Sequence, residues 1–339
     1  DEGSTVPFIA RYRKEATDSL DDTQLRHLDE RLLYLRELED RRKSVLETIK
    51  GQGKLTPSLQ QSIEQAETKQ RLEDLYLPFK VKRRTKAQIA IEAGLEPLAV
   101  SLFADPNKQP EAEAKAFLRE AFSTAAGDNP GVADIKAALE GATFILMERF
   151  AEDADLIAQL RAQQWAGALI VSKVVEANAE KGVKFRDYFD YSEQIRKIPP
   201  HRALALFRGR TEDVVRISLK LPEEVEASWS LALGAQEGCI ATHFGWSNQS
   251  RPGDEFIANV VRLTWRGKLS MSIETQLFSE LRATAEAEAI RVFARNLRDL
   301  LLAAPAGTKH TMGLDPGIRT GVKVAVVDGT GKLLDTATI

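Results

Sequence analysis

The pattern in this chain that could carry chemistry surrounds Asp315. This aspartate follows an apolar run that is typical of a strand, and Pro316-Gly317 and Thr320-Gly321 come after it. A carboxylate at the end of a strand is a suitable ligand for Mg²⁺, and two-metal catalysis needs several carboxylates that converge from different strands and helices. In the alternative interpretation, the Asp-Pro-Gly sequence only forms the turn of a β-hairpin. The motif alone is therefore weak evidence for a metal site.

Carboxylate partners for Asp315 are not evident in the rest of the chain. Asp328 and Asp335 fall in or beside predicted turns, so neither is a convincing second ligand. We therefore expect no catalysis, no bound metal and no cofactor in these 339 residues. The alternative is a metal-dependent nuclease whose remaining carboxylates lie beyond residue 339, on a later strand and on a final helix.

Three short basic clusters form the second candidate site. Guanidinium and ammonium groups bind phosphate oxygens, so each cluster could contact the backbone of RNA or DNA. Each could equally be a solvated surface loop or pair with neighbouring acids such as Glu212. Charge reversal at Arg83 and Arg84 is predicted to weaken binding to any nucleic acid. The clusters consist of Arg11, Arg13 and Lys14, of Lys80, Lys82, Arg83, Arg84 and Lys86, and of His201, Arg202, Arg208 and Arg210.

The composition excludes several classes of protein. With 43% hydrophobic and 29% charged residues, wholesale disorder is excluded. The formal net charge of −3 excludes a uniformly basic surface but allows local basic patches. The single cysteine, Cys239, excludes an internal disulfide and a zinc knuckle. No uncharged stretch reaches the roughly 18 apolar residues of a membrane span, and no signal peptide is evident, so we expect a cytoplasmic protein. Because the sequence begins with Asp1, we expect its start to be missing.

A helical hairpin is predicted at the N-terminal end. Leucines recur at three- and four-residue steps through residues 22–50, which is typical of one long amphipathic helix. Glycines at 51 and 53 end that helix, and Thr56-Pro57 begins the next, since Thr caps free N–H groups and Pro needs none. The leucines are predicted to pack in a helical core. They are Leu25, Leu28, Leu32, Leu35 and Leu38.

The elements that must position the second and third basic clusters are short. Two helices, at 87–93 and 96–103, flank Gly94 after the second cluster, which resembles a helix-turn-helix. A helix is predicted at 201–208 and a strand at 214–219. The aromatic residues of 185–191 could stack on bases, but packing at a helix end is the favoured interpretation.

The remaining segments are predicted to be mainly helical. Helices are expected at 111–122, throughout 132–180, in short pieces over 227–268, and from residue 272 to about 304. His243 is expected to pack or lie on the surface, because no cluster of metal-binding residues surrounds it. After residue 311 the pattern changes to strand, turn, strand, glycine turn and strand.

Four blocks of the chain resemble the Tex family of bacterial transcription accessory proteins. The blocks come in the expected order and cover residues 5–21, 72–99, 199–210 and 289–335. Within the last block, the Gly313, Asp315, Pro316-Gly317 and Thr320-Gly321 pattern resembles the RuvC and YqgF branch of RNase H-like domains. Departures from the family pattern are small. Asp18, Phe79 and Val81 stand where Gly, Tyr and Pro are expected, and the loss of Pro would loosen the second basic cluster.

This resemblance implies a mainly α fold and a domain order. A multi-helical N-terminal region with helix-turn-helix character would span residues 1–270, with the helix-turn-helix-like part at about 72–210. A long bridging helix would follow at 271–307, and the first strands of an α/β RNase H-like (YqgF) domain at 308–339. The family continues with helix-hairpin-helix modules and an OB-fold that binds RNA, so we expect this chain to be a fragment.

The function that the resemblance implies is nucleic-acid binding, RNA above all, by a transcription accessory protein that is not catalytic in this part. The partners would then be the phosphate backbone of RNA or DNA. A further alternative is a scaffold whose helices dock RNA polymerase or ribosome-associated proteins. Because phosphate contacts weaken steeply with salt and packed protein interfaces respond less, a salt titration separates these two.

Overall fold

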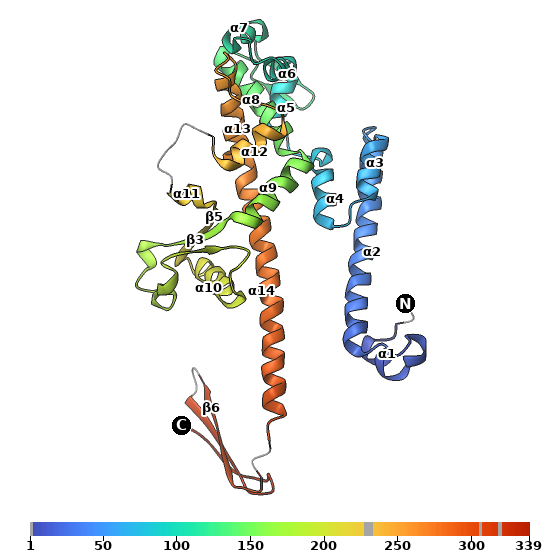
Figure 1. Cartoon of the computed structure of the whole chain (residues 1–339), viewed down its shortest axis with the longest axis vertical. Helices are drawn as coiled ribbons and strands as arrows, with labels where there is room; N and C mark the ends of the chain where they lie inside the picture. The colour runs from blue at the N-terminus through green and yellow to red at the C-terminus, as the bar shows by residue number, and fades with distance from the viewer. Residues whose placement is uncertain (1–2, 227–232, 305–306, 318–320) are drawn as a thin grey trace. The chain divides into compact units, whose positions relative to one another are not determined.

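The computed structural model describes residues 3–226, 233–304, 307–317 and 321–339 (Figure 1). It divides into two compact units. The first unit comprises residues 1–198 and 205–282, and the second comprises residues 199–204 and 283–339. Helices dominate and three small antiparallel sheets accompany them, so the predicted mainly α class is confirmed.

The predicted N-terminal hairpin is present. After α1 (Val6–Tyr12), the long α2 (Asp22–Gly51) packs on α3 (Pro57–Glu64) and α4 (Lys69–Tyr76). Local sequence explains the helix ends: Asp21 and Gln24 form a reciprocal capping box at the start of α2. Likewise, the Thr56 side chain accepts from the N–H of Leu59 at the start of α3.

The predicted leucine core of this hairpin is wrong in its N-terminal half. Leu28, Leu32 and Leu35 are 55%, 40% and 43% exposed, whereas Leu25 and Leu38 are buried. The hydrophobic core begins at Leu38 and draws on the second half of α2, on α3 and on α4, because these two short helices reach only that half. The core side chains are Leu38, Val45, Ile49, Ile63, Ala66, Leu72 and Leu75.

Next come α5 (Lys86–Glu92) and α6 (Glu96–Ala104), the two short helices that were predicted around Gly94. Gly94 has a φ of +87°, which glycine adopts without steric cost, and the chain bends by 101° between the helices. The helix-turn-helix character of this pair stays a prediction. Among the described residues no single helix is long and apolar enough to cross a membrane, and only this bent pair reaches that length and composition jointly.

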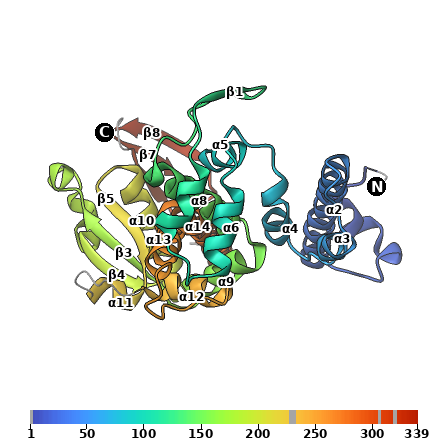
Figure 2. The same cartoon turned by 90° about the horizontal axis from the view of Figure 1, so that it is seen from above.

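The apolar centre of the first unit is α8 (Ile135–Ala151), which packs on α5, α6, α7 (Pro110–Ala114) and α13 (Asp254–Thr264) (Figure 2). Buried side chains occur on all sides of α8, as expected for a helix enclosed by others. The predicted helix at 111–122 is only partly correct. It ends early, and a hairpin of β1 (Phe122–Thr124) and β2 (Gly127–Asn129) replaces its last part, because Gly127 with a φ of +116° makes the turn.

Replacement of Gly141 by alanine is expected to destabilise the first unit by about 1–3 kcal/mol, because added methyl groups overpack a dense core. A Cβ at Gly141 would lie 2.3 Å from Cδ1 of the buried Leu95 and 3.2 Å from Cβ of Ala90. Urea denaturation would measure the free energy of unfolding. Gly238, inside α12 (Ala235–His243), is the matched control, since a Cβ there meets no atom within 4 Å. Gly238→Ala is expected to stabilise by about 0.5–1 kcal/mol, and an equal loss in both variants would contradict the packing argument.

The predicted continuous helix over 132–180 is wrong beyond residue 168. After α8, α9 (Ala154–Gly167) ends and β3 (Leu169–Val174) begins, and β3 lies between β4 (Asp190–Gln194) and β5 (Val215–Lys220) in an antiparallel sheet. A short apolar run is compatible with a buried strand or a buried helix, and periodicity does not separate them. The strand predicted at 214–219 is confirmed as β5, and the helix predicted at 201–208 is confirmed within α10 (Pro200–Thr211).

Short helices fill the described part of 227–268, as predicted. They are α12 and α13, preceded by α11 (Pro222–Glu226). Trp229 lies outside the described residues. A π-helical turn, Trp265–Leu269, joins α13 to the long α14 (Ser270–Leu301). His243 packs as predicted: its Nε2 lies 3.1 Å from Oδ1 of Asp153, and its ring meets that of Phe244 edge-on.

The apolar stripe predicted along α14 is buried only in its first half. Ile273, Leu277, Leu281 and Ala285 are buried. Phe293, Leu297, Leu300 and Leu301 are exposed, so their predicted packing is wrong for the described residues. Most of the buried half belongs to the first unit, whose helices pack on it, whereas the exposed half belongs to the second unit. Pro305, predicted to end this helix, lies outside the described residues.

The second unit contains the three predicted strands in an antiparallel sheet of order β6-β7-β8. They are β6 (Thr311–Gly317), β7 (Gly321–Val327) and β8 (Leu333–Thr338). The turn between the last two strands is built on Asp328. Its Oδ1 accepts from the N–H and hydroxyl of Thr330 and from the N–H of Lys332, and these bonds lower the pKa of Asp328.

Candidate nucleic-acid interface

The second basic cluster, Lys80–Lys86, is named the basic arm here, and acids of the protein itself hold much of it. Nζ of Lys80 lies 2.6 Å from a carboxylate oxygen of Glu73 on α4. Nζ of Lys82 pairs with Glu152 and lies 3.4 Å from Glu148, both on or next to α8. Burial raises the pKa of Glu152. These two lysines therefore anchor the arm rather than present charge freely to a ligand.

Arg84 and Lys86 are also engaged within the fold. Arg84 donates from Nε to Glu92 of α5 at 3.2 Å and from a terminal nitrogen to the carbonyl of Asp128 at 2.9 Å. The hydrogen bond from Arg84 lowers the pKa of Glu92. The ammonium of Lys86 lies 4.9 Å from the ring centroid of Phe144 on α8, within the range of a cation–π contact.

Arg83 is the member of the arm that faces outward. Its side chain is exposed, and it makes no hydrogen bond or ion pair with any residue that the structure describes. Four cations of the arm thus hold it against the rest of the protein, and the guanidinium of Arg83 is exposed to solvent. Val81, where the family pattern has Pro, is exposed as well, so ion pairs rather than a proline ring set the shape of the loop.

The first cluster lies at the end of α1. Arg11 and Lys14 are exposed, whereas Nε of Arg13 donates to Glu15 at 2.9 Å. The hollow beside Arg11 and Lys14 also contains Asp21 and Asp22, so acids share this surface with the cations. A purely cationic patch is therefore not formed here.

The third cluster is spread along α10. Arg208 donates from Nε to Glu212 at 2.9 Å, and Lys184 pairs with the same carboxylate. This confirms, for Arg208, the alternative prediction that the cluster pairs with neighbouring acids. Arg210 lies over the ring of Phe278, 5.8 Å from its centroid. His201 and Arg202 are exposed at the start of the helix, in residues that belong to the second unit.

The aromatic residues of 185–191 mainly pack within the protein. Phe185 is buried against the backbone of Gly209, and Tyr188 and Tyr191 meet edge to face with ring centroids 5.2 Å apart. This confirms the packing interpretation for Phe185 and gives no stacking platform there.

A basic surface that the sequence did not reveal lies on the sheet of the first unit. In the observed register Lys173 of β3 lies between Arg216 of β5 and Asp190 of β4, and it forms an ion pair with Asp190. Directly opposed residues share a face, and so do alternate residues of a strand, so Lys220 lies on that face too. Neither Arg216 nor Lys220 has an acidic partner among the described residues. This surface was missed because residues 169–174 were predicted to be helical.

Asp315 lies on the exposed β6, and its directly opposed residue on β7 is Lys323. The two side chains share a face of the sheet. Among the described residues, no group of three or more His, Cys, Asp or Glu side chains is arranged to hold a metal ion. Gly321 follows the motif with a φ of +79°, whereas Thr320 lies outside the described residues.

Sequence comparisons find related proteins across the whole chain. A family model described as Tex central region-like matches residues 105–293. Models described as Tex-like protein N-terminal domain and Tex protein YqgF-like domain match residues 1–50 and 309–339.

Individual relatives are longer than this chain. It is 55% identical over its full length to Protein YhgF of Escherichia coli (strain K12), of which it covers 43%, and 54% identical to Protein tex of Bordetella pertussis, of which it covers 42%. The human S1 RNA-binding domain-containing protein 1 is 29% identical over 98% of this chain, which covers 33% of that protein. The chain therefore spans less than half the length of these relatives.

Proposed function

Because this chain belongs to the Tex family, we propose that it is a nucleic-acid-binding part of a transcription accessory protein, that it contacts the phosphate backbone of RNA, and that it is not an enzyme. The names of two relatives point the same way: Transcriptional accessory protein Tex of Neisseria gonorrhoeae and the human S1 RNA-binding domain-containing protein 1. A cytoplasmic location, where RNA is transcribed in bacteria, is part of the proposal.

The observation that carries this proposal is the set of outward cations without acidic partners among the described residues. Arg83 lies on the anchored basic arm, and Arg216 and Lys220 lie on one face of β5. Ion pairs hold the basic arm in place, and the sheet holds β5. The backbone that carries these three side chains is therefore ordered before a phosphate binds. Phosphate contacts of this kind supply sequence-independent affinity.

The absence of catalysis is proposed from the surroundings of Asp315. An ammonium group on the directly opposed Lys323 competes with a divalent cation for the carboxylate, because both are attracted to the same negative charge. Asp328 is occupied by hydrogen bonds within its own turn. Asp315 and Asp328 therefore do not form the pair of convergent carboxylates that two-metal chemistry requires.

Arg83→Glu is expected to weaken the binding of labelled single-stranded RNA and duplex DNA roughly tenfold at low salt, because hydrogen bonds to charged groups contribute about 1.5 kcal/mol or more. The slope of log affinity against log salt should also become shallower by about 0.7 for RNA, the value for one lost phosphate contact. Arg84 is unsuitable for this test, since its reversal would also break the pair with Glu92.

Lys136→Glu is the matched control, because Lys136 is a cation of α8 outside the three clusters and its contact with Glu140, at 4.0 Å and largely exposed, contributes little to stability. It is expected to leave affinity and slope nearly unchanged. Equal losses in both variants would mean that only overall charge matters, and unchanged affinity in Arg83→Glu would remove the basic arm from the interface. No salt-sensitive binding of either nucleic acid by the wild type would overturn the proposed function.

A second candidate function is a scaffold for RNA polymerase or ribosome-associated proteins. The exposed Leu28, Leu32 and Leu35 on α2 favour it, since three leucines on one helical face are an apolar surface that a partner could cover. Binding through such a face would depend little on salt, so a salt titration with a protein partner separates this candidate from phosphate contacts.

A further inference from the structure

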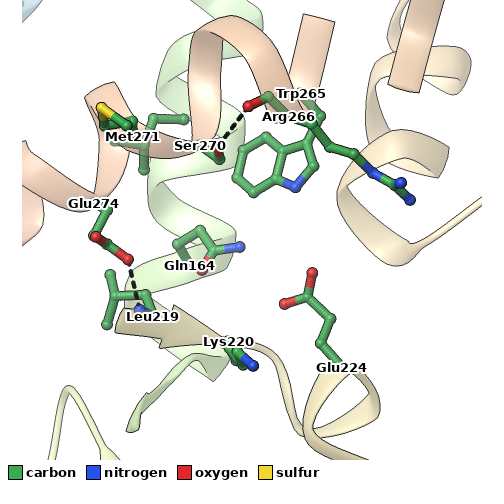
Figure 3. A pocket seen from close by; sticks show the side chains of 10 residues that line it. Gln164, Leu219, Lys220, Glu224, Trp265, Arg266, Ser270, Met271 and Glu274 are labelled. Atoms are coloured by element: carbon green, nitrogen blue, oxygen red, sulfur yellow. Dashed lines mark hydrogen bonds between the residues drawn. The ribbon is translucent and has the colours of Figure 1, made fainter. Parts of the chain in front are cut away.

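A pocket of about 480 Å³ opens in the first unit between β5, the end of α9 and the start of α14 (Figure 3). Its volume falls within the range of small-molecule sites, which is about 300–1,000 Å³. Polar groups from separate elements converge on it: Gln164 of α9, Lys220 of β5, Glu224 of α11, and Glu274 of α14. The indole of Trp265 forms one wall.

Gln164 brings a hydrogen-bond donor that has no acceptor. The residue is only 3% exposed, and its Nε2 is buried without a partner in the structure. Figure 3 shows the amide nitrogen pointing into the space between Trp265 and Glu224. Because buried donors are nearly always paired, a ligand with an acceptor atom at that point would complete the hydrogen bonding of this nitrogen.

Glu224 supplies acceptor capacity on the opposite side. One carboxylate oxygen, Oε2, accepts from the N–H of Leu221 at 2.7 Å and from Nε2 of Gln236 at 3.2 Å. These bonds fix the side chain, and among the described residues the other oxygen, Oε1, accepts no hydrogen bond. Glu274 differs from Glu224, because its carboxylate accepts a hydrogen bond from the N–H of Leu219 at 2.7 Å. It therefore satisfies a backbone donor of the edge strand β5.

Trp265 supplies a flat apolar surface at a distorted point of the backbone. It begins the π-helical turn Trp265–Leu269, and such turns are frequent at functional sites. Aromatic side chains stack on bases of any sequence in single-stranded nucleic acids. Trp265 is 8% exposed, so a planar ligand would lie against the part of the indole that lines the pocket, and Figure 3 shows Gln164 and Glu224 on the same side of that ring.

The cations beside the pocket complete the pattern. Lys220 lines it, and Arg216 lies on the same face of β5. A nucleotide chain that passes along this face would place phosphates near both side chains while one base turns into the pocket.

We propose that this pocket binds one guanine base of single-stranded RNA. The inference rests on the proposed function. Guanine presents an acceptor, O6, beside two donors, N1–H and the N2 amino group, on its Watson–Crick edge, and unpaired bases are read on this edge. O6 would accept from Nε2 of Gln164, and the two donors would donate to the free side of the Glu224 carboxylate. Adenine, cytosine and uracil lack this order of one acceptor and two donors.

The test compares three probes: guanosine monophosphate and two five-nucleotide single-stranded RNAs, UUGUU and UUAUU. Isothermal titration calorimetry with the wild-type chain is expected to show about tenfold tighter binding of UUGUU than of UUAUU, the discrimination that a good pair of base contacts provides. Glu224→Gln should abolish this preference while leaving the salt slope unchanged, because it replaces an acceptor oxygen and touches no phosphate.

Glu223→Gln is the matched control, since the adjacent, exposed Glu223 undergoes the same change of charge outside the pocket. It should keep the preference. Gln164→Met gives a second variant of similar size, and it removes the buried donor without leaving a new unpaired group. It should lower the affinity for UUGUU towards that for UUAUU.

The outcomes separate the two proposals. Equal, salt-sensitive binding of both RNAs would overturn the guanine assignment and leave the proposed function standing. No binding of either RNA at any salt concentration would overturn the proposed function as well. Binding of guanosine monophosphate that depends on Glu224, without any preference between the RNAs, would reassign the pocket to a free nucleotide and overturn its role in strand recognition.

Discussion

Asp254→Ala is expected to lower the free energy of unfolding of the first unit by about 3–5 kcal/mol, the range observed when one partner of a buried ion pair is removed. The Asp254 side chain is only 2% exposed. It accepts from the indole N–H of Trp246 at 2.9 Å, from the N–H groups of Gln249 and Arg251 at 2.8 Å, and from the Arg251 guanidinium at 2.8 Å. Urea denaturation of wild type and variant would measure the loss.

The pH dependence of stability gives an independent measurement. Burial acts to raise the pKa of Asp254, but the side chain and backbone of Arg251 and the donors from Gln249 and Trp246 together hold it well below its usual range. A depressed folded-state pKa means that the carboxylate contributes its full stability above the unfolded pKa of about 3.9 and loses it as the pH falls towards the folded value.

Wild type should therefore lose stability, progressively as the pH falls below about 5, that an Asp254→Asn variant does not lose, because asparagine does not titrate. Asp29→Asn on the exposed face of α2 is the control, and it should leave the acid dependence as in the wild type. An Asp254→Asn variant with the wild-type acid profile would show that other carboxylates govern acid unfolding.

Asp74→Ala is expected to have a similar effect, about 3–5 kcal/mol, through the contact between α4 and α9. Both terminal nitrogens of Arg161 donate to the Asp74 carboxylate at 3.0 Å, and the two side chains are 17% and 5% exposed. Removal of the carboxylate leaves a guanidinium with little access to water, and among the described residues the acceptor that remains is Oε1 of Gln276, which binds its Nε at 2.9 Å. Equilibrium denaturation would report the change.

The same two helices provide the control. Arg71 of α4 pairs with Asp155 of α9, but these side chains are 34% and 74% exposed, so Asp155→Ala should cost at most about 1 kcal/mol. A double variant, Asp74→Leu with Arg161→Leu, should recover much of the loss, because replacement of both charges leaves no unpaired ion. Similar costs for Asp74→Ala and Asp155→Ala would refute the role assigned to burial.

This contact also supports the candidate interface. Glu73, next to Asp74 on α4, receives hydrogen bonds from Lys80 and Arg41, and although burial acts to raise its pKa, these bonds lower it overall. A shift of α4 would therefore release one anchor of the basic arm. Loss of stability and loss of nucleic-acid affinity should be separable, because Arg83 itself makes no described ion pair.

Features with local causes were correctly predicted from the sequence. The start of α3 follows from Thr56 and Pro57, the short α5 and α6 from the break at Gly94, and the strands β6 to β8 from alternating apolar residues between turns. Each depends on residues a few positions apart, whose hydrogen bonds and steric limits form within one turn of chain. The family was likewise identified from contiguous blocks.

Which apolar residues are buried was decided only by tertiary packing. The leucines of α2 have the same spacing along the helix, yet Leu38 is buried and Leu32 is exposed, because α3 and α4 cover only one half. Residues 169–174 form a strand because two other strands supply hydrogen-bond partners, which a short apolar run by itself cannot specify.

The charge pattern of the candidate sites was decided in the same way. The basic arm reads as five cations in the sequence, but acids far along the chain neutralise several of them, such as Glu148 for Lys82, and leave Arg83 presented. The pocket of Gln164, Glu224 and Trp265 draws on three separate elements and has no local signature. The sequence alone thus determined the family, the helix ends that have a local cap or a glycine break, and the positions of the cations. Only the folded structure decided which charges and which buried amide remain available to a ligand, because pairing and desolvation depend on contacts between distant segments.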